Sequence, residues 1–170
     1  EVKKYEKPWA LTGTKMKRAH NIVNSLFLSP EELEKKNFER YDKYKVVEEN
    51  EVMYEEYLMD DADICLVAFG ISARVSKNAV NEARKAGIKA GLIRPITLWP
   101  FPKKVLRDAA DKCKAFICVE MNMGQMIEDV ELAVRCKKPV YLCNRTGGMI
   151  PDPADVLKMI KDVNKKGGNE

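Results

Sequence analysis

Four short apolar runs from residue 62 onward constrain the fold most, because a segment of helical periodicity follows each one. The runs are predicted strands at residues 63–69, 89–93, 115–120 and 139–143. Runs this short that are apolar throughout are typical of strands buried on both faces of a sheet. The predicted helices that follow them cover residues 73–86, 102–113, 124–136 and 152–165.

These repeated strand–helix cycles predict an α/β fold. Strands joined through a helix run parallel, so we expect a three-layer domain with a mostly parallel sheet covered by helices. In such sheets, ligands and partners meet the loops beyond the carboxyl ends of the strands. The predicted place for a site is therefore the set of loops after Phe69, Ile93, Glu120 and Cys143.

The first 61 residues lack such a cycle and are predicted to form an arm and a helical linker. Ser29 caps a helix, Pro30 suits its first position and Glu32 completes a capping box. We expect this helix to run on as far as Tyr54 or Leu58. The predicted domain boundaries are 1–61 for the helical extension and 62–166 for the α/β domain.

Composition and charge exclude several classes of protein. Hydrophobic residues make up 45% and charged residues 33% of the chain, which suits a packed core and is unlike a disordered chain. The net charge of +4 is far from the concentrated positive field of a nucleic-acid-binding protein. The sequence has no apolar run of about 18 residues and no signal peptide after Glu1, so we expect a cytoplasmic protein without membrane or nucleic-acid partners.

The five cysteines do not form a metal-binding pattern. Cys65, Cys118 and Cys143 lie inside the apolar runs, where a thiol packs as a small hydrophobic group. The spacing between Cys113 and Cys118 lacks the tight repeats that hold iron–sulfur clusters or zinc, and His20 is the one histidine of the sequence. We therefore expect no metal site, and free thiols in a reducing compartment.

Two interpretations are open for four polar side chains near the strand ends. Ser72 and Arg74 follow the first strand, at the start of a helix whose free amides favour an anion. Arg94 and Arg145 follow the second and fourth strands and can each bind a phosphate or a carboxylate. These residues are candidates for binding a phosphate ligand such as coenzyme A. The alternatives are a structural turn for residues 70–74, since no nucleotide-binding glycine motif is present, and an internal salt bridge for Arg145.

A proline-rich loop is a candidate for a subunit interface. Residues 94–102 contain three prolines, which stiffen the loop because each also restricts the residue before it. Aromatic side chains on a stiff loop suit the centre of an interface, although packing under the sheet edge is the alternative. The interface candidates here are Thr97, Trp99 and Phe101.

A methionine-rich loop after the third strand supplies further interface candidates, Glu120, Asn122 and Gln125. A carboxylate at a strand end can act as a general base, but no histidine, lysine or second acid lies near Glu120 in the sequence. We interpret Glu120 as a structural hydrogen-bonding residue. We predict no catalytic residue in this chain.

Several motifs taken together resemble one enzyme family. They are Trp9-Ala10-Leu11-Thr12-Gly13, Tyr54-Glu55-Glu56-Tyr57, the run from Gly91 to Pro102, Glu120-Met121-Asn122 with Gly124-Gln125-Met126, and Arg145-Thr146-Gly147-Gly148. At these places the sequence is similar to the C-terminal part of the alpha subunit of 2-oxoacid:ferredoxin oxidoreductases. The resemblance is strongest to the type that acts on branched-chain 2-oxoacids such as 3-methyl-2-oxobutanoate.

The resemblance implies a fold like the transketolase C-terminal domain. The whole enzyme decarboxylates 2-oxoacids on thiamine diphosphate with Mg, makes acyl-CoA, and passes electrons through iron–sulfur clusters to ferredoxin. The implied partners are a pyrimidine-binding domain of the same subunit, expected before residue 1, and beta, gamma and ferredoxin-like delta subunits. The chain itself is then an interface domain that binds none of these cofactors and is inactive alone. The alternative is a module that binds coenzyme A or another phosphate ligand at the strand ends.

Overall fold

A computed structural model describes residues 3–11, 13 and 15–166 of the chain. The chain divides into two units, residues 1–43 and 44–170, and each is described by itself. No helix in the described part combines the length and the apolar character that crossing a bilayer requires.

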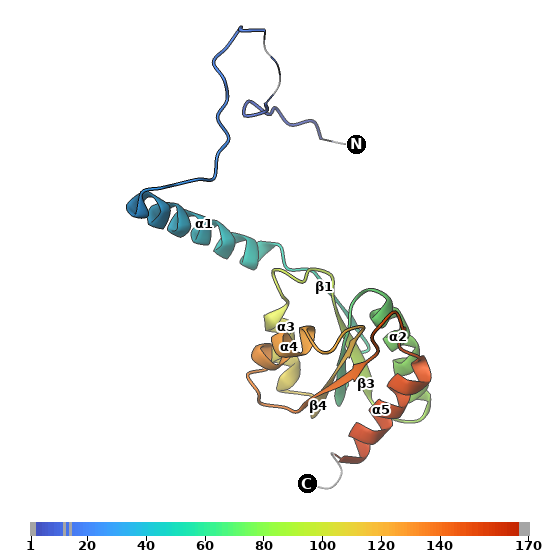
Figure 1. The fold of residues 1–170 in the computed structure, drawn as a ribbon. Helices are drawn as coiled ribbons and strands as arrows, with labels where there is room; N and C mark the ends of the chain where they lie inside the picture. Colours follow the sequence, from blue (N-terminus) through green and yellow to red (C-terminus); the bar gives the residue numbers. More distant parts are fainter. Residues whose placement is uncertain (1–2, 12, 14, 167–170) are drawn as a thin grey trace. The chain divides into compact units, whose positions relative to one another are not determined.

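One five-stranded sheet lies at the centre of the larger unit (Figure 1). The strands are β1 (Tyr54–Tyr57), β2 (Ile64–Val67), β3 (Ala90–Pro95), β4 (Ala115–Glu120) and β5 (Val140–Asn144). Their order across the sheet is β1-β3-β2-β4-β5. Strands β2 to β5 run parallel to their neighbours, whereas β1 is antiparallel to β3. The four predicted strands and the mostly parallel sheet are confirmed.

Four helices cover the two faces of the sheet, as the three-layer prediction required. Helices α2 (Gly70–Lys85) and α5 (Pro153–Lys166) pack on one face, and α3 (Lys103–Ala110) and α4 (Met126–Ala133) pack on the other. Side chains alternate along β2: Ile64 and Leu66 join the first layer, and Cys65 and Val67 join the second. Each fully buried aliphatic side chain contributes about 1.5–3 kcal/mol, so these alternating residues hold the layers together.

The helix that precedes the sheet is shorter than predicted. Helix α1 covers Pro30–Asn50, and the chain then forms β1, with Tyr54 opposite Pro95 and Tyr57 opposite Leu92. The predicted continuation to Tyr54 or Leu58 is therefore wrong. Strand β3 has a free edge, and pairing with residues 54–57 satisfies backbone groups that a longer helix would leave open. The sheet thus includes a strand from before residue 62.

Gly91 lets the chain pass closely over the sheet on its way from β1 to β2. A Cβ atom at this position would lie 2.6 Å from the carbonyl oxygen of Leu58, 2.6 Å from Sδ of Met59 and 3.0 Å from Cβ of Ala62. Only a residue without a side chain leaves this room. Gly91 therefore fixes the route of residues 58–62.

The start of α1 agrees with the predicted cap. The backbone N–H of Glu32 donates to Oγ of Ser29 at 3.4 Å. The carboxylate that accepts from the Ser29 hydroxyl, at 2.8 Å, is that of Glu31 and not that of Glu32. A backbone hydrogen bond and the Ser29 hydroxyl lower the pKa of Glu31. The described residues between 3 and 28 form no helix or strand, and Thr12 of the family motif lies outside the described residues.

Four of the five cysteine thiols are buried: Cys65, Cys113, Cys118 and Cys143. Loss of hydration raises the pKa of each of these thiols, to about 11 for Cys113. A thiol that stays protonated is a poor nucleophile. Cys136, just after α4, is exposed.

We expect a single fast-reacting thiol in the native protein. Iodoacetamide at pH 8 should label Cys136 first, and the four buried cysteines should react only when the domain unfolds. Peptide mass spectrometry after a short labelling pulse measures this. The Cys136→Ser variant is the control and should show no early label, whereas early label on Cys65 or Cys118 would contradict the packing described above.

Candidate functional site

The loops after the parallel strands all leave one edge of the sheet, as predicted. The start of β1 lies at the same edge, because β1 is antiparallel and Tyr54 is opposite Pro95 at the end of β3. We call this surface the carboxyl edge. It comprises residues 53–54, 69–74, 95–103, 121–125 and 145–152.

Ser72 and Arg74 lie in the first turns of α2 and not in a loop. Gly70, with φ of +57°, follows Phe69 directly and begins the helix. Ser72 is buried, with 4% of its surface exposed, whereas Arg74 is exposed. A buried hydroxyl cannot reach a phosphate in solvent, so Ser72 is a packing residue of α2.

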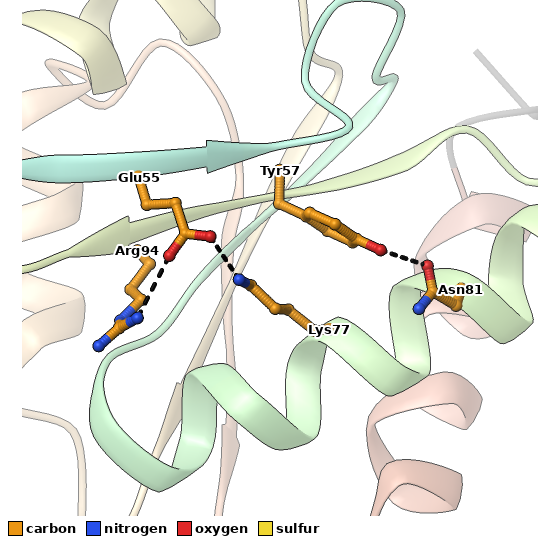
Figure 2. A network of polar contacts seen from close by, with 5 residues as sticks. All are labelled: Glu55, Tyr57, Lys77, Asn81 and Arg94. Atoms are coloured by element: carbon orange, nitrogen blue, oxygen red, sulfur yellow. Dashed lines mark hydrogen bonds and ion pairs between the residues drawn. The ribbon is translucent and has the colours of Figure 1, made fainter.

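Arg94 belongs to a polar network that anchors β1 (Figure 2). Its guanidinium donates to one oxygen of the Glu55 carboxylate at 3.2 Å, and Lys77 of α2 donates to the other oxygen. The Tyr57 hydroxyl donates to Oδ1 of Asn81 at 2.8 Å. Lys77, and then Arg94, hold the pKa of Glu55 below its ordinary value of 4.5. The network ties β1 to both β3 and α2.

Arg145 is also paired within the chain, with Asp155 of α5. Arg145 thus forms the internal salt bridge that the sequence analysis held as its alternative, and Arg94 forms one with Glu55. Of the four phosphate candidates, Ser72 is buried and Arg94 and Arg145 are held in ion pairs, whereas Arg74 is exposed.

The Glu120 side chain caps α4. It is 2% exposed, and its carboxylate accepts from the backbone N–H groups of Gln125 at 3.2 Å, Met126 at 2.8 Å and Ile127 at 3.0 Å. Asn122 donates to the same carboxylate at 3.1 Å. The first N–H groups of a helix have no partner inside it and favour negative charge, so a buried carboxylate is stabilised there. The structural role predicted for Glu120 is confirmed.

Asn122 and Asn144 fix the loop between β4 and α4. The Asn122 side-chain oxygen accepts from the N–H of Gly124 at 2.7 Å, and Asn144 donates to the carbonyl oxygen of Asn122 at 2.7 Å. The Arg145 N–H donates to the carbonyl oxygen of Glu120 at 3.2 Å. These bonds join two neighbouring loops of the carboxyl edge into one structure.

The proline-rich loop is held to the residue before β1. The Met53 N–H donates to Oγ1 of Thr97 at 3.0 Å, and the Thr97 hydroxyl donates to the carbonyl oxygen of Pro100 at 2.9 Å. The Trp99 ring, which is 54% exposed, meets the Tyr44 ring edge-on at 5.2 Å between centroids. A groove of about 640 Å³ runs beside this loop. Apolar residues such as Val52, Leu98 and Pro102 line it together with charged ones, which are Glu48, Glu49, Lys103, Lys104, Arg107 and Asp129.

The predicted interface residues separate into two groups. Phe101 and Glu120 are buried inside the domain, at 8% and 2% exposure, so they shape the carboxyl edge from below and present no surface to a partner. For Phe101 the packing alternative of the sequence analysis therefore holds. The exposed or half-buried candidates are Thr97, Trp99, Asn122 and Gln125.

His20 lies in the smaller unit, beside an open hollow of about 690 Å³. Residues 11, 13, 15, 16 and 18–21 line the hollow, among them Leu11, Met16 and Asn21. None of its described lining residues is an acid or a cysteine, so His20 has no partner there for metal binding or nucleophilic catalysis.

The described residues show no cluster of side chains built for a metal ion. Within the described ranges, no three or more histidine, cysteine, aspartate or glutamate side chains gather as a metal site. Among the groups that could hold a diphosphate, Arg94 and Arg145 are paired and Glu120 occupies the amides of α4, whereas Arg74 is exposed near the start of α2. No chemical step is assigned to this chain.

The three-layer fold, with exposed aromatic and apolar side chains at its carboxyl edge, defines the class of the chain as an α/β domain. The sequence profile of the pyruvate:ferredoxin oxidoreductase core domain II matches residues 62–156, and the chain belongs to this family.

Individual proteins of known family are also similar to this chain in sequence. The chain is 50% identical over 155 residues to the ketoisovalerate oxidoreductase subunit VorB of Methanothermobacter marburgensis, a match that covers 91% of this chain and 44% of that protein. The chain therefore spans less than half the length of the curated relatives it matches.

Two solved structures share the fold. The 2-oxoglutarate:ferredoxin oxidoreductase from Magnetococcus marinus, solved with 2-oxoglutarate, coenzyme A and succinyl-CoA bound, matches with a TM-score of 0.66 and 19% identity over 90% of this chain and 26% of that chain. A split-gene transketolase, solved as an inactive beta4 tetramer, matches with a TM-score of 0.57 and 19% identity over 65% of this chain and 40% of that chain. The predicted transketolase-like fold is confirmed.

We expect Glu120→Gln to destabilise the domain by about 2–3 kcal/mol, because an amide NH₂ would face backbone donors and the start of α4 would lose its anion. Urea unfolding followed by circular dichroism measures the change. Glu131→Gln on the exposed side of α4 is the matched control and should change stability by less than about 0.5 kcal/mol. Equal losses in the two variants would contradict the capping role.

The Glu55 network predicts a pH-dependent contribution to stability. The pKa of Glu55 is lower in the folded chain than its ordinary 4.5, so the network stabilises fully above pH 4.5 and loses its effect as the pH falls through the folded pKa. Glu55→Gln should cost about 1 kcal/mol or less at pH 7, since its partners are partly exposed. The difference from wild type should disappear in acid, as measured by thermal unfolding between pH 3 and pH 7. The exposed neighbour Glu56→Gln should show neither effect.

Proposed function

We propose that the chain is the C-terminal part of the alpha subunit of a 2-oxoacid:ferredoxin oxidoreductase. The enzyme converts a 2-oxoacid, coenzyme A and oxidised ferredoxin into acyl-CoA, CO₂ and reduced ferredoxin. Its proposed substrates are branched-chain 2-oxoacids such as 3-methyl-2-oxobutanoate, and its proposed location is the cytoplasm. Thiamine diphosphate, Mg and iron–sulfur clusters belong to parts of the enzyme outside this chain.

One observation carries the proposal: the match to a ketoisovalerate oxidoreductase subunit at 50% identity over 91% of this chain. The family profile covers residues 62–156. The match to the ketoisovalerate oxidoreductase subunit is longer, at 155 residues, and so extends beyond that region. At this level of identity the substrate preference of the relative is the best guide to the 2-oxoacid.

The proposed role of this chain within the enzyme is structural. Two of its three candidate arginines, Arg94 and Arg145, are held in ion pairs within the chain, and the buried carboxylate of Glu120 caps α4. The exposed residues Trp99 and Gln125, together with the half-buried Thr97 and Asn122, offer contacts to a partner. The proposed partners are a pyrimidine-binding domain of the same subunit, the beta, gamma and ferredoxin-like delta subunits, and ferredoxin.

The assembled enzyme tests the proposal. Co-expression of the full subunit with its partner subunits should give coenzyme A-dependent ferredoxin reduction with 3-methyl-2-oxobutanoate. We expect kcat/KM for this substrate to exceed that for 2-oxoglutarate by at least about tenfold, because a site built for a branched apolar chain leaves a second carboxylate unpaired. A preference for 2-oxoglutarate or pyruvate would contradict the proposed substrate.

The 170-residue chain alone supplies the second arm of this test. Calorimetric titration with thiamine diphosphate and Mg should show no binding, and titration with coenzyme A should shift no amide resonance at Ser72, Arg74, Arg94 or Arg145. Tight binding of either ligand would overturn the structural role.

A further inference from the structure

The two outer strands of the sheet differ in how their open edges are protected. Within the part of the chain that the structure describes, β1 and β5 each pair with a neighbouring strand on one side only. Glu55 and Glu56 place two carboxylates in β1. β5 has the uncharged sequence Val-Tyr-Leu-Cys-Asn, and its ladder with β4 contains no bulge. Charges and bulges commonly keep an edge strand from pairing with another chain, so the edge of β5 is unprotected.

Every second residue of β5 directs its backbone groups to this open edge. At the start of the strand the carbonyl oxygen of Pro139 accepts from β4 at 2.9 Å, and just past its end the N–H of Arg145 donates to the carbonyl oxygen of Glu120 at 3.2 Å. Alternate residues of a strand bond to the same neighbour, so the odd-numbered residues between them face β4. The residues whose N–H and C=O groups point away from β4 are therefore Val140, Leu142 and Asn144.

A hollow of about 330 Å³ lies along the second half of this edge. Residues 142–145 line it in succession, although Leu142 packs in one helical layer and Cys143 in the other. Residues on opposite faces of a sheet share one hollow where it opens onto the backbone edge between the faces. Asp155 and Met159 of α5 line the same hollow. The backbone edge of β5 is therefore accessible to another strand.

This strand is complementary to a second copy of itself when the two run antiparallel. Leu142 is the central residue of β5, so a two-fold axis beside it places Leu142 opposite Leu142 of the second copy. The same axis places Val140 opposite Asn144 of the second copy. Opposed residues that both direct their backbone groups into the contact exchange a pair of hydrogen bonds. Each outward donor of β5 then meets an outward acceptor.

The charges near the two ends of β5 favour the same direction. Lys137 and Lys138 lie just before the strand, whereas Asp152 and Asp155 follow it. An antiparallel pair brings the start of each strand next to the end of the other, so lysines approach aspartates. Lys137 and Asp155 already have ion-pair partners within the chain, which makes Lys138 and Asp152 the complementary charges across the contact.

The surface around the edge of β5 is large enough for a specific contact. Five residues at about 3.4 Å each give a length of about 17 Å, and a sheet with one helical layer on each face is about 30 Å thick. The surface is therefore about 500 Å² in each copy, or about 1,000 Å² for the pair, which reaches the lower limit of specific interfaces.

We infer that two copies of this chain pair through the open edges of β5, antiparallel about Leu142, so that their two sheets join into one. A contact of this kind uses the same surface of both copies and closes on itself. The carboxylates of Glu55 and Glu56 protect the opposite edge of each sheet, so the joined sheet does not grow further. The inference goes beyond the proposed function, because it concerns β5 and no substrate.

A symmetric disulfide in the full subunit tests the pairing and its register. Leu142→Cys, combined with Cys136→Ser to remove the exposed thiol, places two thiols opposite each other at a Cα separation of about 5.5 Å, which a disulfide can span. We expect mild oxidation to link two subunits through position 142 of each, as mapped by peptide mass spectrometry. Glu56→Cys on β1, in the same background, is the matched control and should give no link. No link at 142, or an equal yield at 56, would overturn the inference.

Hydrogen exchange in the assembled enzyme gives an answer without a new thiol. Val140→Pro removes an outward N–H and none of the bonds to β4, so it should speed exchange of the Leu142 amide at least about tenfold by weakening the pair. Val140→Thr has a similar shape, retains the N–H and is the control. The Tyr141 amide, which faces β4, should exchange slowly in all three proteins.

Every other outcome of these two measurements counts against a second copy. A Leu142 amide that exchanges in the unsubstituted assembly as fast as the loop at 146–150 would show an open edge. A slow Leu142 amide without a disulfide at 142 would show that a different strand covers β5. Neither measurement uses the 2-oxoacid, so a failed pairing leaves the proposed function unchanged.

Discussion

Burial of the central strands on both faces is the constraint on which the rest of the structure depends. Every residue of β2 and β4 is buried, and alternate side chains enter opposite helical layers. Neither face of these central strands is open to solvent. The domain therefore contacts its surroundings through the outer surfaces of its helices and the ends of its strands. The parallel direction of the four strands then gathers all their connecting loops at a single edge.

The character of the surface at that edge depends on which partners its polar groups bind. The Glu120 carboxylate accepts hydrogen bonds from the backbone amides of α4. Arg94 forms an ion pair with Glu55, and Arg145 forms one with Asp155. Hydrogen bonds and ion pairs therefore face inward, and methionine, isoleucine and tryptophan side chains are left outside. A surface made in this way suits protein contact, which agrees with a chain that matches less than half of its relatives' length.

The sequence predicted the features of the candidate site that depend on neighbouring residues. It did not predict those that depend on contacts between residues far apart in the chain. The loops were located correctly because strand and helix periods are local properties. The ion pair of Arg94 could not be predicted because its partner Glu55 lies 39 residues away, on a strand within a segment that the sequence analysis expected to be helical. Phe101 and Glu120 were placed among the surface candidates because the sequence gives no sign of whether a loop side chain turns inward.

The sequence by itself determined the three-layer α/β fold, the four parallel strands, the start of α1 and the burial of most thiols, since each follows from spacing along the chain. Only the tertiary structure decided the fifth strand, its anchoring by Lys77 and Arg94, and the gathering of apolar side chains from separate loops at one edge. These features depend on which distant segments become neighbours. That choice is made by the free energy of the whole packed domain, which no single segment of the sequence contains.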